Sequence, residues 1–344
     1  MKALKYILFL ILIAIIGLAI YIAVQPNEFS FNRSKIIKAP VSVVFNKVND
    51  FKNWPDFSPW IEQEPTATLI FGDTTSGTNG NYAWKGDILG EGSMKNLSVV
   101  IDQSINQYIT FIKPFKSESE INWTFETSEE GTKVTCGMNG KQDFMTKMYT
   151  TFAGSIEENT APDFDRGLYK LDSIIQVDMS RYSIKINGIT QHGGGYYLYN
   201  TTSCKISELN TKMQEMMTTI INYASEHHIK MAGAPFANYI KWDEENNAVI
   251  FSSCLPTTEK VITVPNSDIL TGQFLPFNAL KTTLKGDYKN LKEAWETAMN
   301  YIPENNLEIP NDGPMLEVYS TDPMETPNPA DWITEIYIAV KRPQ

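Results

Sequence analysis

An uncharged run of nineteen residues, from Tyr6 to Val24, most constrains what this chain can form. The run is rich in Ile, Leu and Ala, and as a helix it is about 28 Å long, which is enough to cross the hydrocarbon core of a membrane. Lys2 and Lys5 precede it. We therefore expect residues 1–25 to form an N-terminal transmembrane helix.

A secretory signal peptide is the alternative interpretation of the same run. Signal peptides have a shorter apolar region and a small-x-small cleavage site. Here the run ends Ala19-Ile-Tyr-Ile-Ala-Val without an Ala-x-Ala, which favours an uncleaved anchor. Lys2 and Lys5 favour a cytoplasmic N-terminus. The expected protein is thus single-pass in the cell membrane with its soluble part outside the cytoplasm (periplasmic), although Arg33, Lys35 and Lys38 beyond the helix oppose that orientation.

The remaining chain is long enough for two globular domains, since it has 344 residues, 42% apolar and 20% charged. Its net charge of -11 and the lack of a Lys/Arg-rich patch disfavour nucleic-acid binding, because an acidic surface repels phosphates. The three cysteines and three histidines have no metal-ligand spacing, so we predict no metal and no cofactor. One disulfide between Cys204 and Cys254 stays open, but a buried free thiol is the commoner use of such residues.

The first globular stretch begins with a predicted strand, Arg33–Lys38, followed by a helix that starts at Ala39-Pro40. Apolar residues of that helix recur at helical spacing from Val41 to Val48. Six strands are then predicted at Ala67–Phe71, Gly80–Lys85, Ser93–Gln103, Gln107–Lys113, Glu118–Glu126 and Thr132–Gly140. A helix with an apolar stripe follows from about Ala161.

The phrase from Ile36 to Trp54, with "Ala-Pro" entering a helix and then "Asp-Phe-Lys-Asn-Trp", resembles the START-like (SRPBCC, polyketide-cyclase-like) family. The resemblance implies a helix-grip domain over residues 32–178, in which a long C-terminal helix closes a curved sheet over an apolar cavity. Aromatic residues such as Trp84 and Trp123 are candidates to line that cavity, although plain core is their commoner use.

The second globular stretch repeats one pattern twice. A strand, a methionine-rich helix from Ile206 to about His228 and two strands are followed by a strand, a helix after Asn290 and two more strands. The last two strands are predicted at Pro314–Ser320 and Ile333–Lys341. We expect both helices on one side of a shared sheet, with a groove on the other side.

Residues Lys285 to Val340 resemble the C-terminal half of a gyrase-inhibitor-like (GyrI-like) effector-binding domain, and the looser match starts near Arg181. The resemblance implies a domain over residues 181–344 built as a duplicated strand-helix-strand-strand unit. The predicted fold class of the whole chain is therefore α+β: a transmembrane helix, a START-like domain and a GyrI-like domain.

A glutamate on the last strand anchors an aromatic ligand pocket in that family, which implies Glu335 here. Alternation places Glu335 and Tyr337 on one strand face, and places Glu317 and Tyr319 together on the neighbouring strand. The alternative for Glu335 is an ordinary solvated face. The predicted ligand-binding residues are Glu335, Tyr319, Trp295, Tyr337, Tyr239 and Phe251. No catalytic or metal-binding residue is assigned.

Aromatic walls around a carboxylate suit flat or cationic molecules. The leading hypothesis is a membrane-anchored protein that binds a small hydrophobic or cationic ligand. Two alternatives remain open: a hydrolase of electrophilic small molecules that uses Glu335, and an effector sensor related to transcription. Whether the chain is an enzyme is not decided by its sequence.

Overall fold

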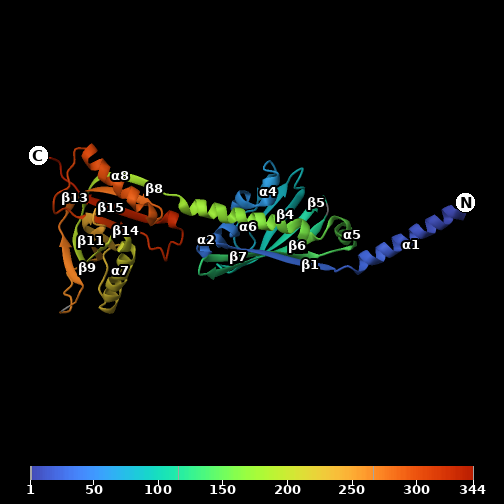
Figure 1. Cartoon of the computed structure of the whole chain (residues 1–344), viewed down its shortest axis with the longest axis horizontal. Helices are drawn as coiled ribbons and strands as arrows, with labels where there is room; N and C mark the ends of the chain where they lie inside the picture. Colours follow the sequence, from blue (N-terminus) through green and yellow to red (C-terminus); the bar gives the residue numbers. More distant parts are fainter. Residues whose placement is uncertain (1, 115, 266, 344) are drawn as a thin grey trace. The chain divides into compact units, whose positions relative to one another are not determined.

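The computed structural model describes residues 2–114, 116–265 and 267–343 (Figure 1). It divides into two compact units, Met1–Val177 and Asp178–Gln344. Each unit contains one antiparallel sheet with its own helices, which is the α+β class expected from the sequence.

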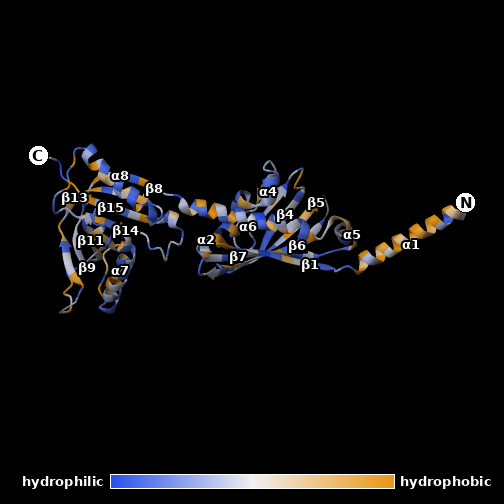
Figure 2. Ribbon diagram, in the orientation of Figure 1, coloured by the Kyte–Doolittle hydropathy of each residue, from blue (hydrophilic) through white to orange (hydrophobic). Residues whose placement is uncertain are grey.

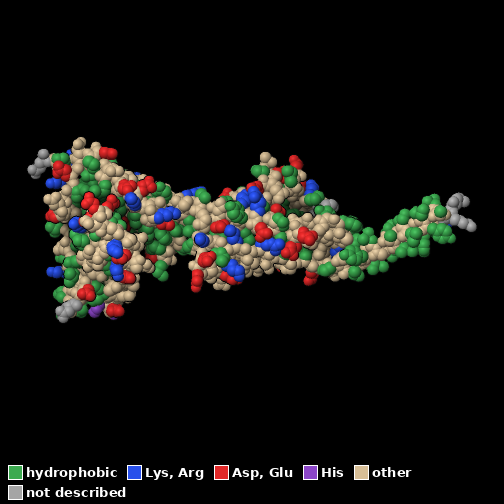
Figure 3. Space-filling model, in the orientation of Figure 1, with side chains coloured by type: hydrophobic (Ala, Val, Ile, Leu, Met, Phe, Trp, Pro, Cys, Tyr) green, Lys and Arg blue, Asp and Glu red, His purple; other side chains and the backbone are tan. Residues whose placement is uncertain are grey.

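The uncharged run forms one helix, α1 (Lys2–Val24), which is hydrophobic along its length in Figure 2. Its stretch from Ala3 to Val24 has a mean hydropathy of 3.2, and nearly all of its side chains are exposed. Figure 3 shows hydrophobic side chains along the surface of this helix. By length and composition α1 fits a membrane span, and a signal sequence fits the same description.

The sheet of the first unit has seven antiparallel strands in the order β1-β7-β6-β5-β4-β3-β2. The strands are β1 (Glu28–Ile37), β2 (Thr68–Phe71), β3 (Asn81–Lys85), β4 (Glu91–Val100), β5 (Ser104–Lys113), β6 (Ser117–Ser128) and β7 (Gly131–Lys141). The helices after α1 are α2 (Val41–Asn49), η1 (Phe51–Asn53), α3 (Trp54–Phe57), α4 (Pro59–Gln63), α5 (Phe144–Ala153) and α6 (Ile156–Ser180). All six strands predicted after the first helix are present, and α2 begins at Val41 with Pro40 as its N-cap, directly after the predicted start at Ala39-Pro40.

Aromatic side chains fill the space that the long helix α6 closes over the sheet. Phe51, Trp54 and Tyr82 pack with ring centroids 4.9–6.2 Å apart, and Trp54 meets Trp123 edge-on. A cavity of about 40 Å³ lies among Trp54, Trp123 and Phe164 of α6. A single water needs roughly 10–15 Å³ by this measure, so a space of this size is too small for a lipid.

Two features of this unit differ from the sequence prediction. The stretch between Gly140 and Ala161, where the sequence predicts no helix, contains α5, which begins after Asp143 because that side chain accepts a hydrogen bond from the Thr146 amide. The following helix starts at Ile156 and tolerates Pro162 within its second turn. The helix α5 has only ten residues, so its apolar residues repeat too few times for their periodicity to predict a helix from the sequence.

The sheet of the second unit has eight antiparallel strands in the order β12-β9-β11-β10-β14-β15-β13-β8. The strands are β8 (Ser183–His192), β9 (Gly195–Lys205), β10 (Phe236–Asp243), β11 (Ala248–Thr257), β12 (Leu270–Phe274), β13 (Phe277–Lys285), β14 (Met315–Tyr319) and β15 (Ile333–Ala339). The helical segments are η2 (Ile206–Glu208), α7 (Leu209–Glu226), η3 (Tyr288–Asn290), α8 (Leu291–Glu304) and η4 (Pro329–Asp331). The predicted repeats are β9-α7-β10-β11 and β13-α8-β14-β15, and they meet where β10 pairs with β14.

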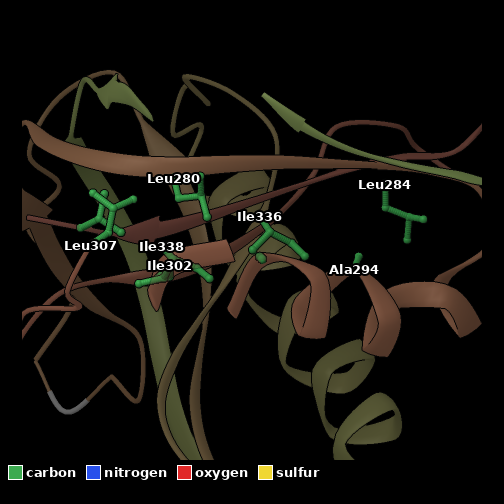
Figure 4. Packing of buried hydrophobic residues seen from close by; sticks show 9 residues of the cluster. Leu280, Leu284, Ala294, Ile302, Leu307, Ile336 and Ile338 are labelled. Atoms are coloured by element: carbon green, nitrogen blue, oxygen red, sulfur yellow. The ribbon is translucent and has the colours of Figure 1, made fainter. Parts of the chain in front are cut away.

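Both helices of the second unit cover the same face of its sheet. Ala294, Ala298 and Ile302 of α8 pack on the buried side chains of β13 and β15 (Figure 4). Ile220 and Ala224 of α7 pack in the same way on β9 and β11. The two apolar stripes read from the sequence are therefore the packing faces, and no helix of the described residues in this unit covers the opposite face of the sheet.

Candidate functional site

Strand register divides the predicted ligand-binding residues between two faces of the sheet. Val318 pairs directly with Glu335, and residues that pair directly in antiparallel strands lie on the same face. Glu335 and Tyr337 therefore lie on the helix-free face. Glu317 and Tyr319 alternate with Val318, so they lie on the face covered by α7 and α8. The expectation that Glu335 and Tyr319 point into one groove is corrected by this register.

Glu317 is the carboxylate that the aromatic residues surround. Its side chain is 2% exposed. The indole N–H of Trp295 donates to its Oε2 at 2.6 Å, and the hydroxyl of Tyr319 donates to its Oε1 at 2.7 Å. The hydroxyl of Tyr239 approaches the same Oε1 at 3.5 Å. Three of the six predicted residues thus meet at a glutamate that was not among them.

Each of these groups is positioned by a different element. Tyr239 comes from β10 and Glu317 and Tyr319 from β14, the two strands where the repeats meet. Trp295 comes from the second turn of α8, and its ring crosses that of Tyr239 at 5.4 Å. A second layer continues outward, since Tyr288 packs on Tyr319 at 5.7 Å and on Trp332 at 4.8 Å. These aromatic rings are half-buried, so they form a thin cover between the carboxylate and solvent.

The electrostatics of Glu317 follow from this burial. Burial raises the pKa of Glu317 above its ordinary value. Hydrogen bonds from Trp295, Tyr319 and Tyr239 lower this pKa, but their effect is smaller than that of burial. Within the described residues, no ion pair reaches Glu317. Burial, with the nearby carboxylate, also holds the pKa of the Tyr319 hydroxyl well above its usual range. The site therefore offers a negative charge with neutral donors around it and no built-in cation.

Glu335 has a different environment, because a cation of the chain already pairs with it. Lys281 of the neighbouring strand lies 2.8 Å from its Oε1, and the Tyr337 hydroxyl donates to its Oε2 at 2.7 Å. Partial burial raises the pKa of Glu335, but the hydrogen bonds from Lys281 and Tyr337 outweigh it, and the net pKa lies below its ordinary value. Both partners of the ion pair are about one quarter exposed.

The helix-free face contains a hollow of about 210 Å³, on the side where the sequence predicts a groove. Its walls include His192, Tyr197, Phe236, Phe274 and Val318. His192 Nδ1 accepts a hydrogen bond from the Gly194 amide, and burial lowers the pKa of the imidazole, so His192 is neutral near pH 7. No carboxylate lines the hollow.

Phe251 is the sixth predicted residue, and it lies in the core. Its side chain is fully buried between β11 and α7, in a cluster with Val249 and Met216. Tyr239 is its only neighbour among the predicted site residues, at a ring distance of 6.5 Å. Phe251 therefore packs against Tyr239 and has no exposed surface that could contact a ligand.

Each of the two units matches the model of a known protein family. A START-like match in the first unit precedes a small-molecule-binding match in the second. Residues 37–168 match the family of polyketide cyclase / dehydrase and lipid transport proteins. Residues 196–341 match the GyrI-like small molecule binding domain. Both expected resemblances, and their order, are confirmed. None of the curated proteins matches the chain.

Solved structures also resemble parts of the chain. The EcmrR C-terminal domain is 15% identical, covers 47% of this chain and 99% of its own, and has a TM-score of 0.40. Protein MLL2253 from Mesorhizobium loti is 11% identical, covers 43% and 98%, and scores 0.34. EcmrR in its DNA complex is 14% identical, covers 59% and 87%, and scores 0.41. The expectation that this chain binds no nucleic acid stays a prediction from its acidity.

Proposed function

We propose that this protein is a membrane-anchored receptor whose C-terminal unit binds a small lipophilic cation at Glu317. The observation that carries this proposal is the buried Glu317 carboxylate, which has aromatic neighbours and no ion-pair partner among the described residues. A lone buried charge is costly, and an opposite charge supplied by a ligand removes that cost.

The aromatic residues support a cation over a neutral ligand. Trp295, Tyr239 and Tyr319 present ring faces and O–H or N–H edges around the carboxylate. A cation held over such rings gains roughly 0.5–2 kcal/mol from the ring quadrupoles. Glu335 lacks this advantage, because Lys281 already satisfies its charge. We therefore propose Glu317, with Trp295, Tyr239 and Tyr319, as the ligand-binding set in place of Glu335 and Tyr337.

Opening the site requires movement of its aromatic cover. Trp295 is the proposed gate, because it donates directly to Glu317 and is only half-buried on α8. A bound cation replaces the indole N–H as the partner of the carboxylate. The N-terminal helix α1 is proposed to hold the protein in the membrane, with its globular units outside the cytoplasm.

Benzyltrimethylammonium and its neutral carbon isostere neopentylbenzene form a matched pair of probes for this proposal. Titration calorimetry of the full chain in detergent is expected to show tighter binding of the ammonium compound, because only this probe neutralises Glu317. Equal binding of both compounds would contradict recognition of charge.

Glu335→Gln is the matched control within the same sheet. We expect it to change the affinity for benzyltrimethylammonium less than about twofold, because a partly exposed ion pair on the opposite face contributes little. The measurement is the same titration. A loss comparable to that of Glu317→Gln would return the anchor role to Glu335.

The raised pKa of Glu317 also predicts how stability depends on pH. The folded chain binds this proton more tightly than the unfolded chain, whose carboxyl has the ordinary value of 4.5. The stabilisation is therefore fully present below pH 4.5, and the free energy of unfolding falls as the pH rises through the raised pKa. Hydrogen exchange of the β14 amides should speed up over this range more in the wild type than in Glu317→Gln. The same pH dependence in both proteins would show that Glu317 does not titrate above its ordinary range.

A hydrolase is the second candidate function, and one observation favours it. A carboxyl with a raised pKa, hydrogen-bonded to Tyr319, has the properties of a general acid or base. Turnover of an electrophilic substrate that disappears in Glu317→Gln would establish this activity, whereas saturable binding without product supports the receptor.

A further inference from the structure

The helix α5 has its apolar and polar sides reversed relative to a helix that packs on a core. Phe144, Met145, Tyr149 and Phe152 point to solvent and are 47%, 62%, 64% and 71% exposed. Lys147, on the other side of the same helix, is 5% exposed. Surface helices of soluble domains bury their apolar stripe, but the described residues of the first unit leave this apolar face of α5 uncovered.

Lys147 fastens α5 to the end of α1. Its Nζ donates to the backbone carbonyl of Ala23 at 3.2 Å and to Asn27 Oδ1, and the two helices are in contact. Strand register agrees, since Glu28 at the start of β1 pairs with Lys141 just before α5. Figure 3 shows hydrophobic side chains continuing from α1 to the neighbouring surface at this junction.

The length of α1 sets the depth at which α5 lies. From Lys5 to Val24 the helix rises about 30 Å, the thickness of the hydrocarbon core. Burial in α1 begins only near its C-terminal end, where Ile22 is 3% exposed. Ala23 thus falls at the far boundary of the bilayer, and its contact with Lys147 brings α5 to the same level.

We propose that α5 lies in the interface of the lipid bilayer, with Phe144, Met145, Tyr149 and Phe152 inserted among the headgroups and upper acyl chains. This inference rests on the proposed function, because it takes α1 as a membrane anchor. Aromatic residues favour this depth, and apolar faces of interfacial helices are buried about 5–10 Å. Since the chain carries a net charge of -11, the attachment is hydrophobic and insensitive to salt.

Depth-dependent fluorescence quenching tests this position in the full chain reconstituted into phosphatidylcholine vesicles. Single cysteines labelled with an environment-sensitive dye replace Phe152 of α5, Leu12 of α1 or Tyr169 of α6, in a Cys204→Ser background; Cys136 and Cys254 are buried. Tyr169 is 67% exposed and is the matched control on another helix of the same unit. Lipids carry a spin label either near the headgroup or deep in the acyl chain.

The spin label near the headgroup is expected to quench more than about half of the emission of the dye at Phe152→Cys, because this residue is expected to lie within 5–10 Å of the bilayer boundary. The quenching should be the same at low and at high salt. The dye at Leu12→Cys should respond to the deep label, and the dye at Tyr169→Cys to neither. Quenching at Leu12→Cys without quenching at Phe152→Cys would overturn the inference while leaving the anchor intact. Absence of quenching at Leu12→Cys would overturn the anchor itself and this inference with it.

Discussion

Replacement of Glu317 by glutamine is expected to weaken binding of benzyltrimethylammonium by roughly 10- to 100-fold, since a hydrogen bond or close contact to a charged group contributes about 1.5–3 kcal/mol. Binding of neopentylbenzene should change much less, because glutamine keeps the shape of the side chain and an acceptor oxygen for Trp295 or Tyr319. Titration calorimetry with both probes measures the two losses separately.

Folding should survive this substitution, because it removes a lone buried charge whose pKa is raised by burial. The thermal unfolding of Glu317→Gln therefore serves as the control for the binding result. An equal loss for the cation and the neutral probe would mean that Glu317 shapes the site without recognising charge, and no loss for either would place the ligand elsewhere.

Phe251→Ala is expected to destabilise the C-terminal unit by about 3–5 kcal/mol, since a fully buried phenylalanine leaves a cavity that its neighbours only partly fill. Such a loss is a large part of the roughly 5–15 kcal/mol that stabilises a typical domain. Urea denaturation, with hydrogen exchange of the β11 amides to report on this unit, measures the effect.

Leu275→Ala is the matched control for Phe251→Ala, because Leu275 is apolar, lies in the same unit and is 74% exposed. Its free energy of unfolding should stay within about 0.5 kcal/mol of the wild type. If Phe251→Ala instead lowers ligand affinity without changing stability, then Phe251 is a binding residue, as the sequence predicts.

Much of the fold was predictable from local patterns. The apolar stripe of α8, with Ala294, Ala298 and Ile302, packs on the sheet as its spacing indicates. The alternation Glu317-Val318-Tyr319 correctly puts the glutamate and the tyrosine on one face. These features depend only on the 3.6-residue and 2-residue periods within one element.

The choice of the central glutamate could not be made in this way, because it depends on register between strands. A shift of one residue between β14 and β15 exchanges the two faces. Alternation within each strand gives no register, so it is compatible with Glu335 and Tyr319 in one groove; the pairing of Val318 with Glu335 places them on opposite faces. The ion pair between Lys281 and Glu335 was hidden for the same reason, since it joins two strands far apart in sequence.

A signal for Glu317 was nevertheless present in the chain. Glu317 is two residues before Tyr319 on a strand whose other neighbours are apolar, and an unpaired acid on a helix-covered face is rare in an ordinary core. The exposed apolar side of α5 was less accessible from the sequence, because the burial of Lys147 depends on its contact with Ala23 at the end of α1.

A crystal structure of the full chain with benzyltrimethylammonium bound tests the central claim most directly. We expect the ammonium group within about 6 Å of an aromatic ring centroid and beside the Glu317 carboxylate, with Trp295 displaced from its 2.6 Å contact with Glu317. A cation seated instead in the hollow of the helix-free face, near His192 and Phe274, with Trp295 still bonded to Glu317, would contradict the account.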